Sequence, residues 1–229
     1  MRASNPPKGR TTREEILRLV IADDHRLFLL GLRQFLGKHP GIQVVGEAAT
    51  GLEAVALVAE HRPDILLLDI SMPELNGIEV ARRVHEATPG TQVIILSMHA
   101  DRRYVTEALR AGARGYLLKT CPPEEVLRAI REVASGQFHL GKGIEQVLAE
   151  FVQTSESGGH TPFAILSVRE REVLQLLAEG KSTKQIGDLL NVSSKTVETH
   201  RQHIMDKLQL RTVAELTRYA IREGLTPLE

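Results

Sequence analysis

The first 135 residues alternate between short aliphatic runs and segments with apolar residues at helical spacing. The run Ile65-Leu66-Leu67-Leu68 places four large aliphatic side chains in succession, which suits a central strand buried on both faces of a parallel sheet. The aliphatic runs predict strands over residues 17–21, 42–48, 65–69, 93–96 and 115–118. The segments between and after them predict helices over residues 25–38, 51–61, 78–86, 102–111 and 123–135. This alternation predicts an α/β fold with a five-stranded, doubly wound parallel sheet.

Polar side chains stand where four of these predicted strands end. Asp23 and Asp24 follow the first strand and Asp69 ends the third, whereas Ser97 and Lys119 follow the fourth and fifth. Any one of them alone could cap a helix or be a surface charge. The carboxyl ends of parallel strands lie at one edge of a sheet, where ligands bind in this fold class. All five together at that edge therefore predict a functional site.

The predicted site has the groups needed for phosphoryl transfer. Crowded carboxylates repel one another unless a cation lies among them, and oxygen ligands favour a hard ion such as Mg²⁺. Asp69 can act as a nucleophile toward phosphorus, while Lys119 offsets charge and Ser97 donates a hydrogen bond. The groups expected to hold Mg²⁺ are the carboxylates of Asp23, Asp24 and Asp69 and the backbone carbonyl of Ser71.

The pattern becomes entirely helical in the last third of the chain. Residues 137–164 break the earlier alternation and predict a linker with a short helix over 144–151, and residues 1–15 predict a disordered leader. Ser167 and Glu170 form a capping-box pattern, Thr183 is expected to cap a second helix, and Ser194 to open a third. With a last helix over 213–223, residues 165–229 predict an all-α, four-helix domain containing a helix-turn-helix, behind an α/β domain over residues 16–136.

The predicted helix over 194–208 has one apolar and one polar face. Val197, Ile204 and Leu208 fall on one line at about 100° per residue. The opposite line holds Lys195, Thr199, Gln202 and Asp206. Such a polar face suits reading of the DNA major groove, but it equally suits an ordinary solvated face of a small helical domain.

Composition excludes some classes of protein but does not by itself identify the function. The net charge is zero, and residues 164–229 contain 10 Lys and Arg against 9 Asp and Glu, so a DNA partner has to be argued from local pattern. The single Cys121 excludes an intrachain disulfide and fits a reducing cytoplasm. No apolar stretch approaches the roughly 18 residues that span a bilayer. We therefore expect a cytoplasmic protein without a membrane partner.

The motifs of the first domain resemble the receiver domain of two-component response regulators. The resemblance rests on Asp23-Asp24, Asp69 followed by Met72-Pro73 and Asn76-Gly77, Ser97, and Tyr116 three residues before Lys119. It implies a flavodoxin-like fold, phosphorylation of Asp69 by a sensor histidine kinase, and a switch in which Ser97 moves toward the phosphoryl group and Tyr116 turns inward. His99 is expected near the phosphoryl group.

Residues 166–212 look like the LuxR-type helix-turn-helix, and the two halves together are similar to the NarL/FixJ class of response regulators. By this resemblance Glu198, Thr199 and Gln202 face base edges of double-stranded DNA. The residues expected to contact phosphates are Lys195, Thr196, His203 and Lys207. The last helix resembles the dimerisation surface of the class, with Thr217 and Ala220 as candidates, which implies a homodimer on an inverted repeat when the protein is phosphorylated.

These observations favour a phosphorylation-dependent transcription regulator whose only catalysis is phosphotransfer to Asp69 and its own dephosphorylation. The receiver is expected to cover or misplace the DNA-reading helix until Asp69 is phosphorylated. One alternative is a Mg²⁺-dependent phosphatase, although Ile70 and Ser71 stand where such an enzyme needs a general acid. Another is a receiver that acts without phosphorylation, which the complete set of acidic residues disfavours.

Overall fold

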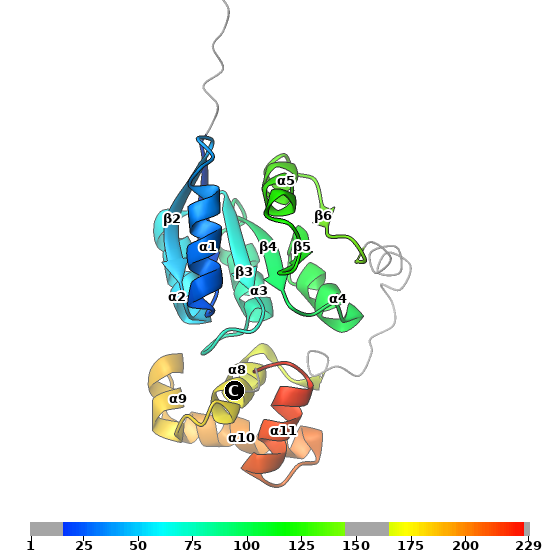
Figure 1. The fold of residues 1–229 in the computed structure, drawn as a ribbon. Helices are drawn as coiled ribbons and strands as arrows, with labels where there is room; N and C mark the ends of the chain where they lie inside the picture. The colour runs from blue at the N-terminus through cyan, green and yellow to red at the C-terminus, as the bar shows by residue number, and fades with distance from the viewer. Residues whose placement is uncertain (1–15, 145–164, 227–229) are drawn as a thin grey trace, which may run out of the picture.

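The chain folds into two domains that lie against each other (Figure 1). The structure, a computed structural model, describes residues 16–144 and 165–226. The predicted leader lies outside the described residues, as does most of the predicted helix over 144–151. The N-terminal domain comprises the described residues 16–144, and the C-terminal domain comprises residues 165–226.

A parallel sheet forms the centre of the N-terminal domain. Its strand order is β2-β1-β3-β4-β5-β6, and every neighbouring pair is parallel. The central strand β3 (Ile65–Asp69) is buried along its whole length, as its run of aliphatic residues predicts. The other strands are β1 (Leu17–Ala22), β2 (Ile42–Ala48), β4 (Gln92–Ser97), β5 (Gly115–Leu118) and β6 (His139–Leu140).

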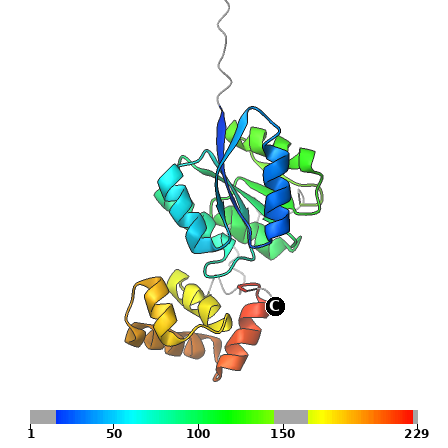
Figure 2. The ribbon, with the colours of Figure 1, turned by 60° about the vertical axis from the view of Figure 1, so that its left-hand side comes forward.

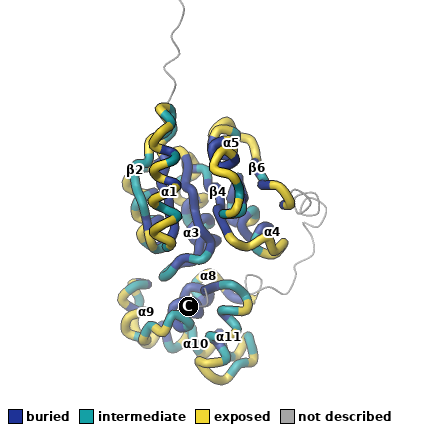
Figure 3. Tube along the Cα trace, viewed as in Figure 1, coloured by how far each residue is buried: buried dark blue, intermediate teal, exposed yellow. Residues whose placement is uncertain are grey.

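Helices cover both faces of this sheet, which confirms the doubly wound arrangement (Figure 2). On one face, α1 (Arg26–Leu36) and α5 (Pro123–Ala134) pack against alternate residues of the strands, including Leu67 of β3. On the other face, Leu66 and Leu68 of the same strand pack against three helices. These helices are α2 (Gly51–His61), α3 (Gly77–Ala87) and α4 (Arg102–Arg110). Figure 3 shows the strands buried between helices whose outer sides are exposed.

The sheet has one more strand than the pattern predicts. The two-residue strand β6 pairs with β5 through Gly115–His139 and Tyr116–Leu140. It lies in the segment expected to be linker, so the N-terminal domain extends beyond residue 136. Two residues are too few to show the alternation that identifies a strand in a sequence, which explains why β6 was missed.

The C-terminal domain consists of four helices around one apolar cluster. They are α8 (Val168–Ala178), α9 (Thr183–Leu190), α10 (Ser194–Leu208) and α11 (Val213–Arg222). The capping box of Ser167 and Glu170 is present, but Ser182 rather than Thr183 caps α9. Helix α10 buries Val197 and Ile204, as its apolar line predicts. No helix in the described parts of the chain has the length and apolar character needed to cross a bilayer.

Helix α8 is the element of the C-terminal domain that faces the sheet domain. In Figure 1 it lies next to the loop between β3 and α3, whereas α10 lies on the opposite side of the C-terminal domain. Polar residues along α8 are buried as deeply as its apolar ones, among them Arg171 and Gln175. An interface between the domains therefore covers a helix face that would otherwise be solvated.

We expect substitution of Gly77 to distort the end of β3. A Cβ atom at Gly77 would lie 2.0 Å from the carbonyl oxygen of Asp69, so backbone has to move. Gly77→Ala should lower the free energy of unfolding by about 3 kcal/mol, as overpacking of a close backbone contact does. Urea denaturation followed by circular dichroism measures this change. Gly90→Ala is the matched control, because a Cβ there meets no atom within 4 Å, and an equal loss in both variants would contradict the prediction.

Candidate functional site

The predicted polar side chains meet at the carboxyl edge of the sheet. The Nζ atom of Lys119 lies 2.8 Å from Asp23 Oδ2 and 2.9 Å from Asp69 Oδ2. Ligand atoms of Asp23, Asp24, His25 and Asp69 all lie within 4.8 Å of one another. Asp23 and Asp69 are only 2% exposed. The topology therefore gathers residues that are far apart in the sequence into one buried acidic pocket.

Burial and charge shift the ionisation of this pocket. Burial raises the pKa of the Asp69 carboxyl, because it outweighs the attraction of the Lys119 ammonium, and the Asp23 carboxylate adds to the increase. Burial alone would lower the pKa of Lys119, but the charge of Asp69 and the contacts with Asp23 outweigh it, so that this pKa is raised. Lys119 is therefore held in its charged form between two carboxylates.

The composition of the pocket fits a divalent cation with oxygen ligands. Asp23, Asp24 and Asp69 supply three carboxylates, and Lys119 supplies one constant positive charge, so the pocket remains net negative when all are ionised. Hard ions such as Mg²⁺ bind at such clusters of carboxylate oxygens. The residues present therefore fit Mg²⁺.

His25 is a member of the cluster that the sequence analysis did not select. Its backbone N–H donates to Asp23 Oδ1 at 2.9 Å, and its Nδ1 lies 2.8 Å from Asp24 Oδ1. The side chain is 63% exposed, so it faces solvent beside the two carboxylates that it contacts. Its position directly after Asp23-Asp24 is the feature of the sequence from which its place in the cluster could have been predicted.

The two residues expected to act as a switch are both hydrogen-bonded to the backbone of His99. Ser97 is fully buried at the end of β4, and its Oγ accepts from the backbone N–H of His99 at 3.1 Å. The Tyr116 hydroxyl donates to the His99 carbonyl at 2.7 Å, and burial raises the pKa of this hydroxyl. The His99 ring stacks on Tyr104 of α4 with centroids 4.7 Å apart. Tyr116 is fully buried in this conformation, so it already points inward.

The loop after Asp69 is held tightly against the strand. The Asp69 Oδ1 atom accepts from the N–H of Ile70 at 2.8 Å, and the carbonyl of Ile70 accepts from Gly77 at 2.8 Å. Asn76 caps α3 by accepting from Ile78 and Glu79, each at 3.1 Å. Ser71 lies in this loop, and its Oγ is 3.5 Å from His99 Nε2. His99 therefore contacts the loop that follows Asp69.

The polar face of α10 is exposed. Five of its seven predicted DNA contacts are exposed and the other two are half-buried, the exposed ones being Lys195, Thr199, Gln202, His203 and Lys207. The N-terminal domain does not cover this helix in the present arrangement, because the domain contacts are made by α8 and by the end of α11. The other form of the expectation, that the helix is misplaced until Asp69 is phosphorylated, remains a prediction. Several predicted contacts have partners within α10 or its cap, such as Gln202, which donates to Asp206 at 2.9 Å, and two are engaged by other helices of the domain. Glu198 accepts from Thr183 at 2.8 Å and pairs with Arg201, and Lys207 pairs with Glu170 at 2.7 Å.

The two dimerisation candidates on α11 differ in their accessibility. Thr217 is half-buried, and its hydroxyl donates to the Val213 carbonyl at 3.0 Å. Ala220 is 0% exposed and belongs to the apolar cluster of its own domain. Its assignment to a dimer surface was wrong, because a helical residue one turn from Leu216 lies on the same buried face.

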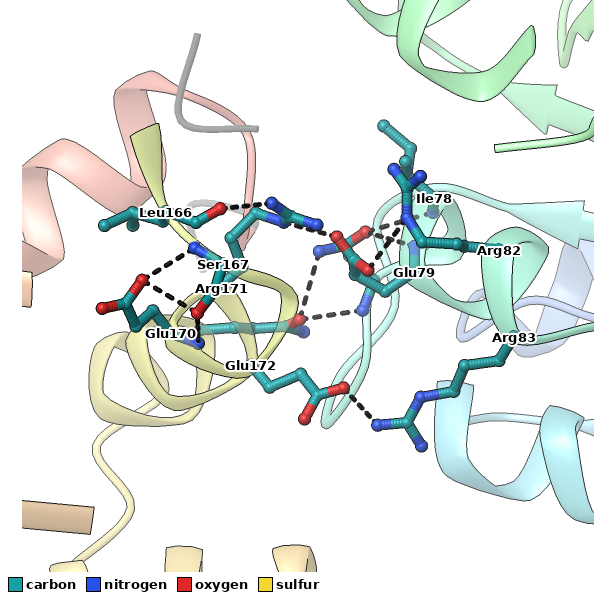
Figure 4. Close-up of polar contacts among 11 residues, drawn as sticks. Ile78, Glu79, Arg82, Arg83, Leu166, Ser167, Glu170, Arg171 and Glu172 are labelled. Carbon is teal, nitrogen blue, oxygen red and sulfur yellow. Dashed lines mark hydrogen bonds and ion pairs between the residues drawn. The ribbon is translucent and has the colours of Figure 1, made fainter. Parts of the chain in front are cut away.

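A polar interface joins the two domains and includes residues that sequence reasoning missed. The Nε atom of Arg171 in α8 lies 2.5 Å from Glu79 Oε1 in α3, and Glu79 is fully buried (Figure 4). A second ion pair joins Arg83 of α3 to Glu172 of α8 (Figure 4). The polar residues of α8 recur three and four positions apart. A helix face exposed to solvent has the same spacing of polar residues. No signal in a single sequence separates these two cases.

The end of α11 makes a smaller contact with α4. Arg103 Nη1 lies 3.5 Å from Glu223 Oε2. A Cβ atom on Gly224 would lie 1.4 Å from the hydroxyl oxygen of Tyr104, so Gly224 allows this ring to approach the C-terminal domain. Tyr104 thus touches both the His99 ring and the C-terminal domain.

Comparison with protein families assigns both domains. The model described as "Response regulator receiver domain" matches residues 19–131. The model described as "Bacterial regulatory proteins, luxR family" matches residues 164–220. Together these matches include the acidic pocket and α10.

Similar proteins share both domains. The "Oxygen regulatory protein NreC" of Staphylococcus epidermidis is 41% identical over 215 residues, covering 91% of this chain and 99% of the relative. NreC of Staphylococcus carnosus is 40% identical with the same coverage.

Solved structures extend the likeness to the fold. A LuxR-family response regulator from Aurantimonas sp. SI85-9A1 is 34% identical, with a TM-score of 0.56 over 58% of this chain and 96% of that one. The response regulator in an RcsB–DNA complex is 26% identical, with a TM-score of 0.55 over 89% of this chain and 96% of that one. This family consists of DNA-binding regulators rather than classical enzymes. The chain belongs to the NarL/FixJ class of two-component response regulators and is a DNA-binding transcription regulator.

Proposed function

We propose that a sensor histidine kinase supplies a phosphoryl group to Asp69, and that the phosphorylated chain binds an inverted DNA repeat as a homodimer. The observation that carries this proposal is the pocket in which Lys119 lies between Asp23 and Asp69, at 2.8 and 2.9 Å. A nucleophilic carboxylate next to a fixed ammonium, with two further carboxylates for a cation, supplies what phosphoryl transfer requires. The only catalysis is transfer to Asp69 and hydrolysis of the product.

Each pocket residue has a distinct task in this proposal. Asp69 attacks phosphorus, Lys119 offsets the charge of the phosphoryl oxygens, and Ser97 donates a hydrogen bond to one of them. Bound Mg²⁺ neutralises further oxygen charge. The groups proposed to hold it are the carboxylates of Asp23, Asp24 and Asp69 and the carbonyl of Ser71.

Ser97 and Tyr116 form the proposed switch. Ser97 donates its O–H to the phosphoryl group while its Oγ accepts from the His99 N–H, which lies 3.1 Å away, so a movement of Ser97 is passed to His99. Tyr116 is tied to the carbonyl of the same residue. A change at Ser97 therefore alters the segment that carries His99, and through the stacked ring it alters the position of Tyr104 on α4.

Helix α10 is proposed to lie in the major groove. Glu198, Thr199 and Gln202 contact base edges, and Glu198 favours a cytosine amino group once it leaves its contact with Thr183. Lys195, Thr196, His203 and Lys207 contact phosphates, where they fix the register of the helix. Thr217 contributes to the dimer contact, and the cytoplasm, where the DNA lies, is the proposed place of action.

Selection of bound sequences from random DNA, with and without a small phosphoryl donor, tests the function as a whole. We expect an inverted repeat that is enriched more strongly with the donor, because phosphorylation favours the dimer that reads two half-sites. Asp69→Asn should remove the effect of the donor. Equal enrichment by the wild type with and without donor would show that phosphorylation does not control DNA binding.

Asp69→Asn should also stabilise the metal-free protein at neutral pH. The folded pKa of Asp69 is raised above 3.8, so its contribution to stability is present below that pH and is lost as pH rises through the folded pKa. With a chelator at pH 7, the variant should melt about 3 °C higher than the wild type and lose that advantage at pH 3. Mg²⁺ should raise the wild-type melting temperature more than that of the variant. Glu86→Gln, at an exposed residue of α3, should show neither effect.

Two substitutions in α10 should weaken DNA binding in different ways. Gln202→Ala should weaken binding to the selected site by about 10- to 100-fold and leave non-specific binding unchanged, because it removes a base contact. Lys195→Ala should weaken binding to all sequences and reduce the salt dependence by about one counterion. Binding measured across salt concentrations distinguishes the two, with Gln137→Ala in the N-terminal domain as control. Identical salt slopes and identical specificity in both variants would contradict these roles.

A further inference from the structure

Helix α8 holds the loop that follows Asp69 through the fully buried side chain of Gln175. Its Oε1 accepts from the backbone N–H of Asn76 at 2.8 Å, and its Nε2 donates to the carbonyl of Met72 at 2.9 Å. These two backbone groups lie on either side of the turn that contains Pro73 and Glu74. One side chain of the C-terminal domain therefore closes this turn of the N-terminal domain from the outside.

A second side chain of the C-terminal domain supports the tip of the same loop. Glu74 has a φ of 69°, in the left-handed region that non-glycine residues rarely adopt. The backbone N–H of Glu74 donates to both carboxylate oxygens of Glu179, at 3.1 and 3.2 Å. Gln175 Nε2 in turn donates to Glu179 Oε1 at 2.8 Å. The loop thus has a conformation that costs free energy locally and that the neighbouring domain compensates.

Two of the ion pairs in Figure 4 join α3 to α8 and so hold the helix that carries Gln175 against the N-terminal domain. Glu79 and Arg171 are both buried, so separating them without water would leave an uncompensated charge. Arg83 and Glu172 form the second pair at the edge of the interface, where Arg83 is about one third exposed. Both pairs join α3 to α8, and α3 begins directly after the loop that Gln175 contacts.

We propose that Gln175 is a positioning residue of the phosphorylation site: docking of α8 fixes the loop that carries the Ser71 carbonyl, and so strengthens Mg²⁺ binding beside Asp69. This inference rests on the proposed function of the acidic pocket. Ser71 lies between Asp69 and Met72, and the Met72 carbonyl is held directly by Gln175. Residues that orient a ligand without touching the ion affect metal affinity in this way.

Reciprocity gives the arrangement a regulatory consequence. If docking strengthens Mg²⁺ binding by a given factor, Mg²⁺ strengthens docking by the same factor. The docked arrangement leaves the polar face of α10 exposed. Loading of the pocket therefore favours an arrangement in which α8 is engaged and α10 remains open to DNA.

Mg²⁺ titration by calorimetry on the full chain tests the proposal without relying on activity. Gln175→Ala should raise the Mg²⁺ dissociation constant by about 10-fold. Gln175→Glu keeps the volume and can still accept from Asn76, but it cannot donate to Met72, so it should also weaken binding. Gln137→Ala is the matched control, since Gln137 is exposed and belongs to the segment between α5 and β6, which lies away from α8 in Figure 1. Phosphorylation by a small donor should slow in the Gln175 variants at low Mg²⁺ and recover at saturating Mg²⁺.

A second variant separates positioning by docking from simple loss of folding. Arg83→Glu places a like charge against Glu172 and leaves the core of the N-terminal domain unchanged, so it should undock the domains and weaken Mg²⁺ binding to the same extent. Combining it with Gln175→Ala should add nothing, because both act through the same contact. Arg131→Glu, an exposed reversal on α5, should bind Mg²⁺ as the wild type does.

The outcomes distinguish this inference from the function on which it rests. Wild-type Mg²⁺ affinity in Gln175→Ala, Gln175→Glu and Arg83→Glu would overturn the positioning role and leave the acidic pocket intact. Tighter binding in these variants would also overturn it, because docking would then oppose the metal. Absence of Mg²⁺ binding in the wild type would overturn both.

Discussion

The contact of Lys119 with Asp23 and Asp69 is the constraint on which the rest of this structure depends. Two carboxylates that are almost completely buried at one sheet edge repel each other, and the ammonium between them is what makes their burial tolerable. Each of the three residues comes from a different strand end, so the pocket exists only when β1, β3 and β5 have the observed order. The remaining negative charge of the pocket raises the free energy of the folded protein. A divalent cation reduces this charge, and a phosphoryl group increases it. Binding of either group therefore changes the forces on the strand ends and on the loops that follow them.

The sequence predicted the pocket because parallel strands impose a simple rule on their ends. Once Ile65–Leu68 is assigned to a central strand, Asp69 has to lie at the carboxyl edge, and the same reasoning places Ser97 and Lys119 there. Burial of Val197 and Ile204 in α10 follows from helical periodicity in the same way. The strand β6 could not be predicted, since His139-Leu140 is too short to show a period. Ala220 was misplaced because the resemblance supplied its role, whereas its position one turn after Leu216 determined its burial.

The domain interface was beyond prediction for a different physical reason. Arg171, Gln175 and Glu179 form a polar line along α8, and such a line has the same composition whether it faces water or the backbone of another domain. Only the partner groups distinguish the cases, and these are backbone atoms of Met72, Glu74 and Asn76, whose identity leaves no mark in the sequence. Hydrogen bonds to backbone atoms do not require particular residue types in the loop. An interface made of hydrogen bonds to backbone atoms can therefore be geometrically specific and still leave no pattern in the sequence.

The polar nature of this interface also explains how two domains can be joined firmly and still separate. The apolar cluster of each domain cannot be opened without exposing aliphatic surface to water, which costs roughly 25 cal/mol per Å². Gln175, Arg171 and Glu79 instead exchange their partners for water when the domains part, so the net free energy of each contact is only about 1 kcal/mol, although leaving one partner buried alone costs more. Such contacts favour two states, fully docked or fully hydrated, over intermediate ones. Because the loop of Asp69 is part of the docked state, a small change in its free energy is enough to shift the balance between them, and α8 is the element through which that shift reaches the DNA-binding domain.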